Sequence, residues 1–172
     1  PHLDDVLIRD HYRNVEIPLH CIEKGLAIAC TEGANSSLVT NLTRSMAIEY
    51  LNTEFSFNKL PPYLLILKIC NSVMNILKPN MFIHTPFLTT LSLFNNSIYY
   101  LSEYTFRGLT HLFSLDLSLN CLSILPVNTF NFTLNLTYLD ISRTSLQILS
   151  KRSLPPSLKV FIASNTYLAS FD

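Results

Sequence analysis

The stretch that decides the fold is LLILKICNSVMNIL, residues 64–77, because its spacing of apolar residues returns every 24 residues as far as residue 149. Three columns at that step hold only leucine: Leu64, Leu88, Leu112 and Leu136; Leu67, Leu91, Leu115 and Leu139; Leu77, Leu101, Leu125 and Leu149. Two more are always apolar: Ile69, Leu93, Leu117 and Ile141; Met74, Ile98, Leu122 and Leu146. So many aligned columns indicate an internal repeat.

A polar column and an aromatic column complete the pattern. The polar column reads Ser72, Asn96, Asn120, Thr144 and, after a shorter repeat, Asn165; the aromatic column reads Phe82, Phe106 and Phe130. The full pattern is L-x-x-L-x-L-x-x-N-x-L, which is typical of leucine-rich repeats.

Each column has a physical reading. The L-x-L pair has period 2, so both side chains point inward from a short strand, and stacked repeats place these strands in a parallel sheet. A buried amide after the strand can satisfy backbone groups of a neighbouring turn, and a phenylalanine ring can fill the wider return path. We therefore predict a repeat solenoid, a leucine-rich repeat horseshoe, with the parallel sheet on the concave face and irregular or 3-10 returns on the convex face.

Three segments are expected along the chain. Residues 1–20 form a leader, residues 21–45 an N-terminal cap containing cysteines, and residues 46–172 about six repeats. In the first repeat Ile48 and Tyr50 are assigned to the inward strand positions; in the last, Val160 and Ile162. The first repeat and the repeat from Leu139 to Val160 are short, and both return through Pro-Pro. The chain reaches Asp172 without a closing cap, so we expect it to be part of a longer protein.

The four cysteines fall into two pairs. Cys21 and Cys30 precede the repeats, where a disulfide across a small hairpin is favoured over two buried free thiols. Cys70 and Cys121 belong to repeats two steps apart, about 10 Å along the sheet, which is beyond the reach of a disulfide. We predict that Cys70 and Cys121 are not bonded to each other.

Composition excludes several classes of protein. The 12 basic and 12 acidic residues give a net charge of zero, so nucleic-acid binding is not indicated. No apolar run reaches the roughly 18 residues of a membrane span. Catalytic motifs are missing from the sequence, and the histidines near the N-terminus match no metal-ligand spacing. We expect no enzyme activity, no metal and no cofactor.

Five N-x-S/T sequons indicate the compartment: Asn35, Asn41, Asn95, Asn131 and Asn135. Together with the cysteine pair they favour a glycoprotein in the extracellular space or the endosomal lumen.

The phenylalanine-bearing repeat of 24 residues, the N-terminal cysteine pair and the run LPPSLKV from Leu154 resemble Toll-like receptor ectodomains over residues 21–172. The resemblance implies a receptor of innate immunity, with ligand-induced homo- or heterodimerisation outside the cell, a membrane anchor and a signalling domain inside it. The alternative is a structural or adhesive leucine-rich repeat protein of the matrix or the neuronal surface.

A protein or microbial ligand is expected on the concave face or along a lateral edge. The outward positions of the strands supply the candidates: Lys68, Phe94, Asp116, Tyr138 and Asp140. Phe94 is expected to be an exposed anchor. Asp116 and Asp140 stand on adjacent strands, where they could meet a basic partner. The alternative is a solvated polar face without a ligand.

Overall fold

The computed structural model describes residues 20–24, 27–31, 44–49 and 57–171. Its main sheet has the strand order β1-β2-β3-β4-β5-β6-β7-β9, in which β1 and β2 are antiparallel and all later neighbours are parallel. These strands are β1 (His20–Lys24), β2 (Ala27–Thr31), β3 (Ser45–Glu49), β4 (Ile66–Cys70), β5 (Thr90–Ser92), β6 (Ser114–Asp116), β7 (Tyr138–Asp140) and β9 (Val160–Ile162). The predicted parallel solenoid is confirmed.

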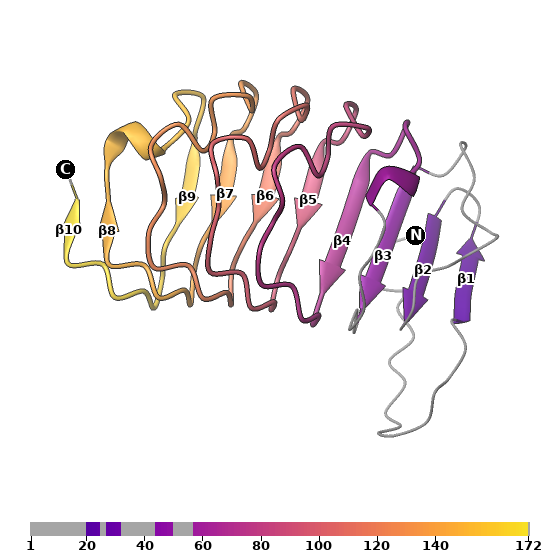
Figure 1. Ribbon diagram of the computed structural model, residues 1–172, viewed down its shortest axis with the longest axis horizontal. Helices are drawn as coiled ribbons and strands as arrows, with labels where there is room; N and C mark the ends of the chain where they lie inside the picture. Colours follow the sequence, from indigo (N-terminus) through magenta and orange to yellow (C-terminus); the bar gives the residue numbers. More distant parts are fainter. Residues whose placement is uncertain (1–19, 25–26, 32–43, 50–56, 172) are drawn as a thin grey trace, which may run out of the picture.

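The returns are mostly irregular and lie opposite the sheet. Within the described residues they contain the 3-10 helices η2 (Phe57–Lys59) and η3 (Lys151–Ser153) and a small parallel pair, β8 (Ile148–Leu149) with β10 (Ser170–Phe171). Figure 1 shows the strands of the large sheet side by side in one layer, and β8 and β10 together towards the C-terminal end. Little helix forms because each return must advance only one strand spacing.

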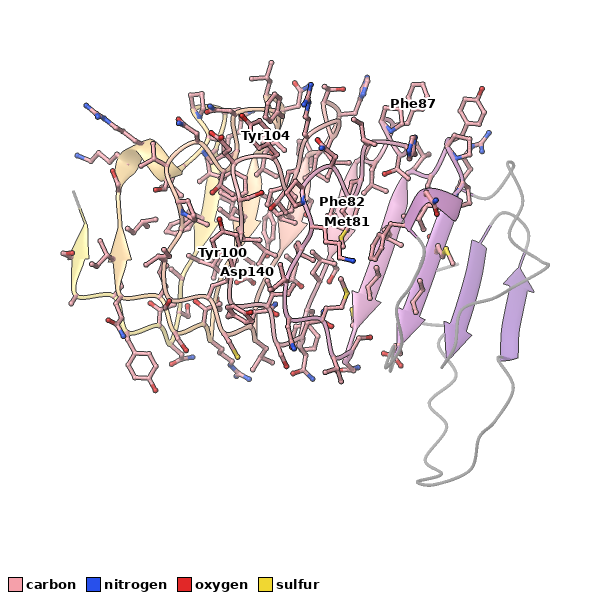
Figure 2. All side chains as sticks on the ribbon, in the orientation of Figure 1. Met81, Phe82, Phe87, Tyr100, Tyr104 and Asp140 are labelled. Atoms are coloured by element: carbon pink, nitrogen blue, oxygen red, sulfur yellow. The ribbon has the colours of Figure 1, made fainter. Side chains whose placement is uncertain are left out.

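The inward columns make the core. Every leucine in the three leucine columns is at most 5% exposed. The aromatic column forms a continuous stack, with ring centroids 6.4 Å apart between Phe82 and Phe106 and 5.6 Å apart between Phe106 and Phe130. Figure 2 shows Phe82 inside the body of the solenoid. The prediction for these rings is confirmed.

The asparagine column ties successive repeats together. Asn120 Nδ2 donates to the carbonyls of Leu93 and Leu117, both at 2.9 Å, while its Oδ1 accepts from the Ile98 amide at 3.0 Å. One repeat earlier, Asn96 Nδ2 donates to the equivalent carbonyls of Ile69 and Leu93, while its Oδ1 accepts from the Ser72 amide at 3.1 Å. Thr144 retains only one of them, a hydroxyl bond to the Ile141 carbonyl. The turn-satisfying role expected of this column is confirmed.

The residue before each polar-column position has a left-handed backbone. These residues are Asn71 (φ 53°), Asn95 (φ 52°), Leu119 (φ 54°), Arg143 (φ 55°) and Asn165 (φ 56°). Asparagine tolerates this region better than branched or long side chains. The chain turns sharply at this point in these five repeats, which sequence analysis did not identify.

The last repeat is one residue out of the predicted register. β9 pairs Tyr138 with Val160 and Leu139 with Phe161, so Phe161 and not Val160 takes the inward position. Val160 is 45% exposed, whereas Phe161, Ala163 and Leu168 pack against the core. Val160 and Ile162 are two apolar residues separated by one position, so their spacing matches an L-x-L pair although they occupy outward positions. The assignment was wrong for this reason. The last polar-column position is therefore Thr166, whose hydroxyl donates to the Ala163 carbonyl, and not Asn165.

The first repeat is also out of register, by two residues. β3 pairs Met46 with Leu67 and Ile48 with Ile69, and both Met46 and Ile48 are buried. The predicted inward pair was Ile48 and Tyr50; Tyr50 lies outside the described residues. Apolar residues alternate from 46 to 50, so periodicity alone fits either register.

The cysteine predictions have different outcomes. Cys70 and Cys121 are free, as predicted. In the β1–β2 hairpin the backbone places Cys21 directly opposite Cys30. Their disulfide stays a prediction, because their side chains are outside the described part of the chain. Residues 1–19 of the expected leader also lie outside it.

Candidate binding surface on the sheet

The outward side chains of the strands form rows across the concave face. The middle row is Lys68, Ser92, Asp116, Asp140 and Ile162, as fixed by the strand register. Ile162, which the sequence assigned to an inward position, stands in this row. Strand pairing thus brings Asp116 and Asp140 side by side, as predicted.

Neutral donors hold the two carboxylates. Asp116 accepts from the Ser92 hydroxyl at 3.2 Å through Oδ2 and from the Ser118 amide at 2.9 Å through Oδ1. Asp140 Oδ1 accepts from the Ser142 amide at 2.8 Å. Serines orient both groups without neutralising them, so this part of the face keeps its negative charge.

Tyr138 belongs to the same patch. Partial burial, followed by the charges of Asp140 and Asp116, raises the pKa of its phenol above the ordinary value. The hydroxyl is therefore a stable hydrogen-bond donor at neutral pH, beside two acceptors. We call Asp116, Tyr138 and Asp140 the acidic patch.

Lys68 and Phe94 are not part of the acidic patch. Lys68 lies on β4, two strands before Asp116, and its charge acts on the thiol of Cys70. Phe94 follows β5 and is half-buried, so the expectation of an exposed ring is wrong, while its role as an anchor stays a prediction. Its backbone carbonyl accepts from the Asn71 backbone amide at 3.2 Å and from Asn96 Nδ2 at 3.3 Å.

Cys70 is a half-buried thiol on this face. Its Sγ lies 3.8 Å from the Ser92 hydroxyl, and burial is the main cause that raises its pKa. The thiol is thus protonated at neutral pH and is a poor nucleophile.

A polar ladder runs beside the turn and was missed in the sequence. Asn95 Nδ2 donates to Asn71 Oδ1 at 2.6 Å, and Asn71 Nδ2 donates to Glu49 Oε1 at 3.2 Å. Glu49 is 5% exposed and its Oε2 has no hydrogen-bond partner. Correct assignment of β3 would have found Glu49, because it pairs with Cys70 in the outward row.

One lateral edge carries stacked aromatic rings, which we call the aromatic edge. Tyr63 and Phe87 stack with centroids 5.6 Å apart, Phe87 and His111 lie 5.7 Å apart, and the Arg44 guanidinium is 5.3 Å from the Tyr63 centroid. Phe87 lies at the upper margin of the molecule in Figure 2. Three of these residues follow the 24-residue step, so their column was available in the sequence.

The sequons differ in position. Asn95, Asn131 and Asn135 are exposed, and Asn135 Nδ2 donates to the Thr110 carbonyl at 2.8 Å. Asn35 and Asn41 lie outside the described residues. Glycosylation of all five remains a prediction.

The described residues contain no group of three or more histidine, cysteine or acidic side chains arranged to hold a metal ion. None of their helices has the length and apolarity needed to cross a membrane.

Residues 86–146 match the family described as Leucine rich repeat. No curated protein matches the chain. The matched repeats and the solenoid together support a leucine-rich repeat protein, a scaffold that typically serves protein interaction rather than catalysis.

Proposed function

We propose that this chain is a ligand-binding part of a Toll-like innate immune receptor, working outside the cell by capture of a protein ligand and receptor dimerisation. The observation that carries ligand capture is the acidic patch: two carboxylates on adjacent strands, oriented by serines, beside a tyrosine donor. The ligand class that fits it is a protein with an exposed basic segment.

The extracellular setting rests on separate observations. Asn95, Asn131 and Asn135 are exposed, so each could carry a glycan without disturbing the core. Cys21 and Cys30 face each other across a hairpin, the arrangement that a disulfide needs. The Toll-like assignment itself rests on the resemblance of the 24-residue repeat and of the LPPSLKV run to Toll-like receptor ectodomains.

Binding of a basic segment can be measured directly. The full chain, secreted from eukaryotic cells, is titrated with an arginine-rich peptide of about ten residues at low and at physiological salt. We expect the double substitution Asp116→Ser and Asp140→Ser to weaken binding at least tenfold, and wild-type binding to weaken with salt. Serine is used because asparagine at either position would complete a new sequon with Ser118 or Ser142.

A control removes a negative charge elsewhere, one charge against the two that the double substitution removes. Glu103→Gln lies on the return and should bind as wild type does. If Glu103→Gln weakens binding as much as the double substitution, the acidic patch is not the binding site.

The receptor role needs a second measurement. The chain is fused to a reporter that is activated only by dimerisation, displayed on cells and exposed to the basic peptide carried on a bivalent protein. Reporter activation supports the receptor. Binding and cell attachment without activation would favour the adhesive alternative.

A further inference from the structure

The aromatic edge continues into a sequon. Tyr63, Phe87 and His111 occupy one column at the 24-residue step, and the next residue of that column is Asn135, in Asn-Leu-Thr. His111 and Asn135 are both exposed. Because equivalent residues of successive repeats lie side by side on neighbouring turns of a solenoid, this candidate glycosylation site stands beside the last ring of the stack.

Hydrogen bonds hold the side chains of His111 and Asn135 in equivalent ways. His111 Nδ1 lies 3.0 Å from the Pro86 carbonyl oxygen, and Asn135 Nδ2 donates to the Thr110 carbonyl at 2.8 Å. Pro86 and Thr110 are themselves one repeat apart. A side-chain amide has two N–H groups, so Nδ2 can carry a sugar in place of one hydrogen and still donate the other. The glycan-bearing nitrogen is therefore held against the residue that precedes His111.

The two ends of the aromatic stack differ. At one end the Arg44 guanidinium covers Tyr63, 5.3 Å from the centroid of its ring. At the other end His111 packs against Phe87, with ring centroids 5.7 Å apart. Among the described residues no second aromatic ring packs against His111, and Asn135 is its neighbour on that side. The stack is thus capped at its Tyr63 end and open beside the sequon.

We propose that the aromatic edge seats the chain's own N-linked glycan: the first N-acetylglucosamine on Asn135 packs its C–H face on the open face of His111. A pyranose ring has one face formed mainly by C–H groups, and the negative face of an aromatic ring attracts their hydrogens. The proposal rests on the extracellular setting of the proposed function and is independent of the ligand.

Covalent attachment favours this occupant over a free sugar. A glycan on Asn135 holds its first ring beside His111 at a high effective concentration, so a contact too weak to capture a sugar from solution is sufficient. The remaining sugars then give the exposed rings of Tyr63 and Phe87, which are 51% and 42% exposed, a hydrophilic cover. The aromatic edge is closed to a macromolecular ligand in this arrangement, whereas the acidic patch on the sheet stays open.

The sequon at Asn131 provides a contrast within the same chain. Asn131 precedes Phe132, whose ring already lies 5.7 Å from the Arg107 guanidinium and 6.2 Å from the ring centroid of Tyr104. One repeat before Asn131 the column holds Arg107, not an aromatic residue. A glycan on Asn131 therefore has no open ring beside it in its own column, and we expect it to leave His111 uncovered.

Carbethoxylation of histidines by diethyl pyrocarbonate, followed by peptide mass spectrometry, tests the contact. The full chain is secreted from eukaryotic cells, its glycans are trimmed to one N-acetylglucosamine, and the occupancy of Asn135 is read from the same peptides. Thr137→Ala removes the sequon and keeps the asparagine, so we expect His111 to react about threefold faster in this variant. His84, which is exposed on the return, is the internal control and should react at an unchanged rate.

Two further variants separate the glycan from other causes. Thr137→Ser keeps the sequon and the hydroxyl that donates to the Phe113 carbonyl, so His111 should react as in wild type. Asn131→Gln removes the other glycan and should also leave His111 unchanged. An unoccupied Asn135, equal His111 rates in wild type and Thr137→Ala, or faster reaction of His111 in either control variant overturns the proposal.

Nuclear Overhauser effects give the direct readout. Protons of the sugar on Asn135 should show contacts to the His111 ring in wild type, and their absence from an occupied chain overturns the proposal. The arginine-rich peptide is titrated against wild type and Thr137→Ala, which should bind it equally. Failure of both chains to bind the peptide would count against the acidic patch and leave the glycan contact standing, so the two proposals can fail separately.

Discussion

The central repeats and the two repeats that flank them are built on the same plan but specify it with different strength. In the centre, leucine, asparagine and phenylalanine columns all agree, and a shift by one residue would bury polar groups. At the ends, Met46 and Ile48 or Phe161 and Ala163 take the inward positions, and towards the C-terminal end Leu154 stands in the phenylalanine column and Thr166 in the asparagine column. Register in a strand is fixed by the sum of its inward contacts, so fewer strong columns leave more than one reading open.

The largest effect should come from the aromatic column of the centre. Phe106→Ala removes a fully buried ring that stacks on both Phe82 and Phe130, and we expect it to cost about 3 to 5 kcal/mol of unfolding free energy. At the end of the column Leu154 is only half-buried, so Leu154→Ala should cost about 1 to 2 kcal/mol. Urea unfolding followed by circular dichroism measures both.

Ser123→Ala is the surface reference for that pair, because Ser123 is exposed and should change stability by less than about 0.5 kcal/mol. Equal losses of unfolding free energy in Phe106→Ala and Leu154→Ala would mean that packing in the centre and at the end of the column contributes equally to stability.

The polar column should show the same contrast on a smaller scale. Asn120→Ala removes the side-chain partner of the buried Ile98 amide and of the Leu117 carbonyl, while the Leu93 carbonyl keeps its bond from Asn96, so we expect a cost of about 2 to 3 kcal/mol. Thr166→Ala loses one partly buried bond and should cost about 1 kcal/mol or less. Hydrogen exchange at the Ile98 amide gives a second readout: exchange should accelerate in Asn120→Ala only, and an unchanged rate would contradict the role of Asn120.

The register of the last repeat can be tested with two neighbouring residues. Phe161→Ala should cost about 2 kcal/mol because the ring packs against the core, while Val160→Ala should cost less than about 0.5 kcal/mol. The reverse order in denaturant titrations would restore the assignment of Val160 to the inward position.

Much of the fold could be read from the sequence because its information is repeated. One strand with L-x-L is ambiguous, but four in step leave one arrangement for residues 64–149. The adjacency of Asp116 and Asp140 followed directly, since neighbouring repeats place equivalent residues on neighbouring strands. Even the aromatic edge lay in a column, at Tyr63, Phe87 and His111.

The remaining features could not be predicted from the sequence because they do not recur as a column at the 24-residue step. Phe94 is half-buried in the turn after β5, and no column of the repeat indicated its burial. Glu49 was not singled out because the inward positions of its strand are apolar in both possible registers, so its neighbour on the next strand could not be fixed from the sequence. The left-handed turn was hidden by its own residues, because asparagine marks it in three repeats while Leu119 and Arg143 occupy it in the other two.

The smallest predicted effect is a gain in stability from making this turn uniform. Leu119 holds a left-handed backbone at φ 54°, and Asn95 before it donates to Asn71 in the polar ladder. Leu119→Asn should relieve backbone strain and let the new amide donate to Asn95, which outweighs the loss of a half-buried leucine. We expect the free energy of unfolding to rise by about 0.5 to 1 kcal/mol. Leu134→Asn makes the same exchange at an exposed position outside the column, where φ is not positive, and should bring no gain. Thermal unfolding of both variants decides: a higher Tm for Leu119→Asn alone ties the gain to the turn, while equal shifts would mean that the exchange itself, and not the left-handed backbone, sets the stability.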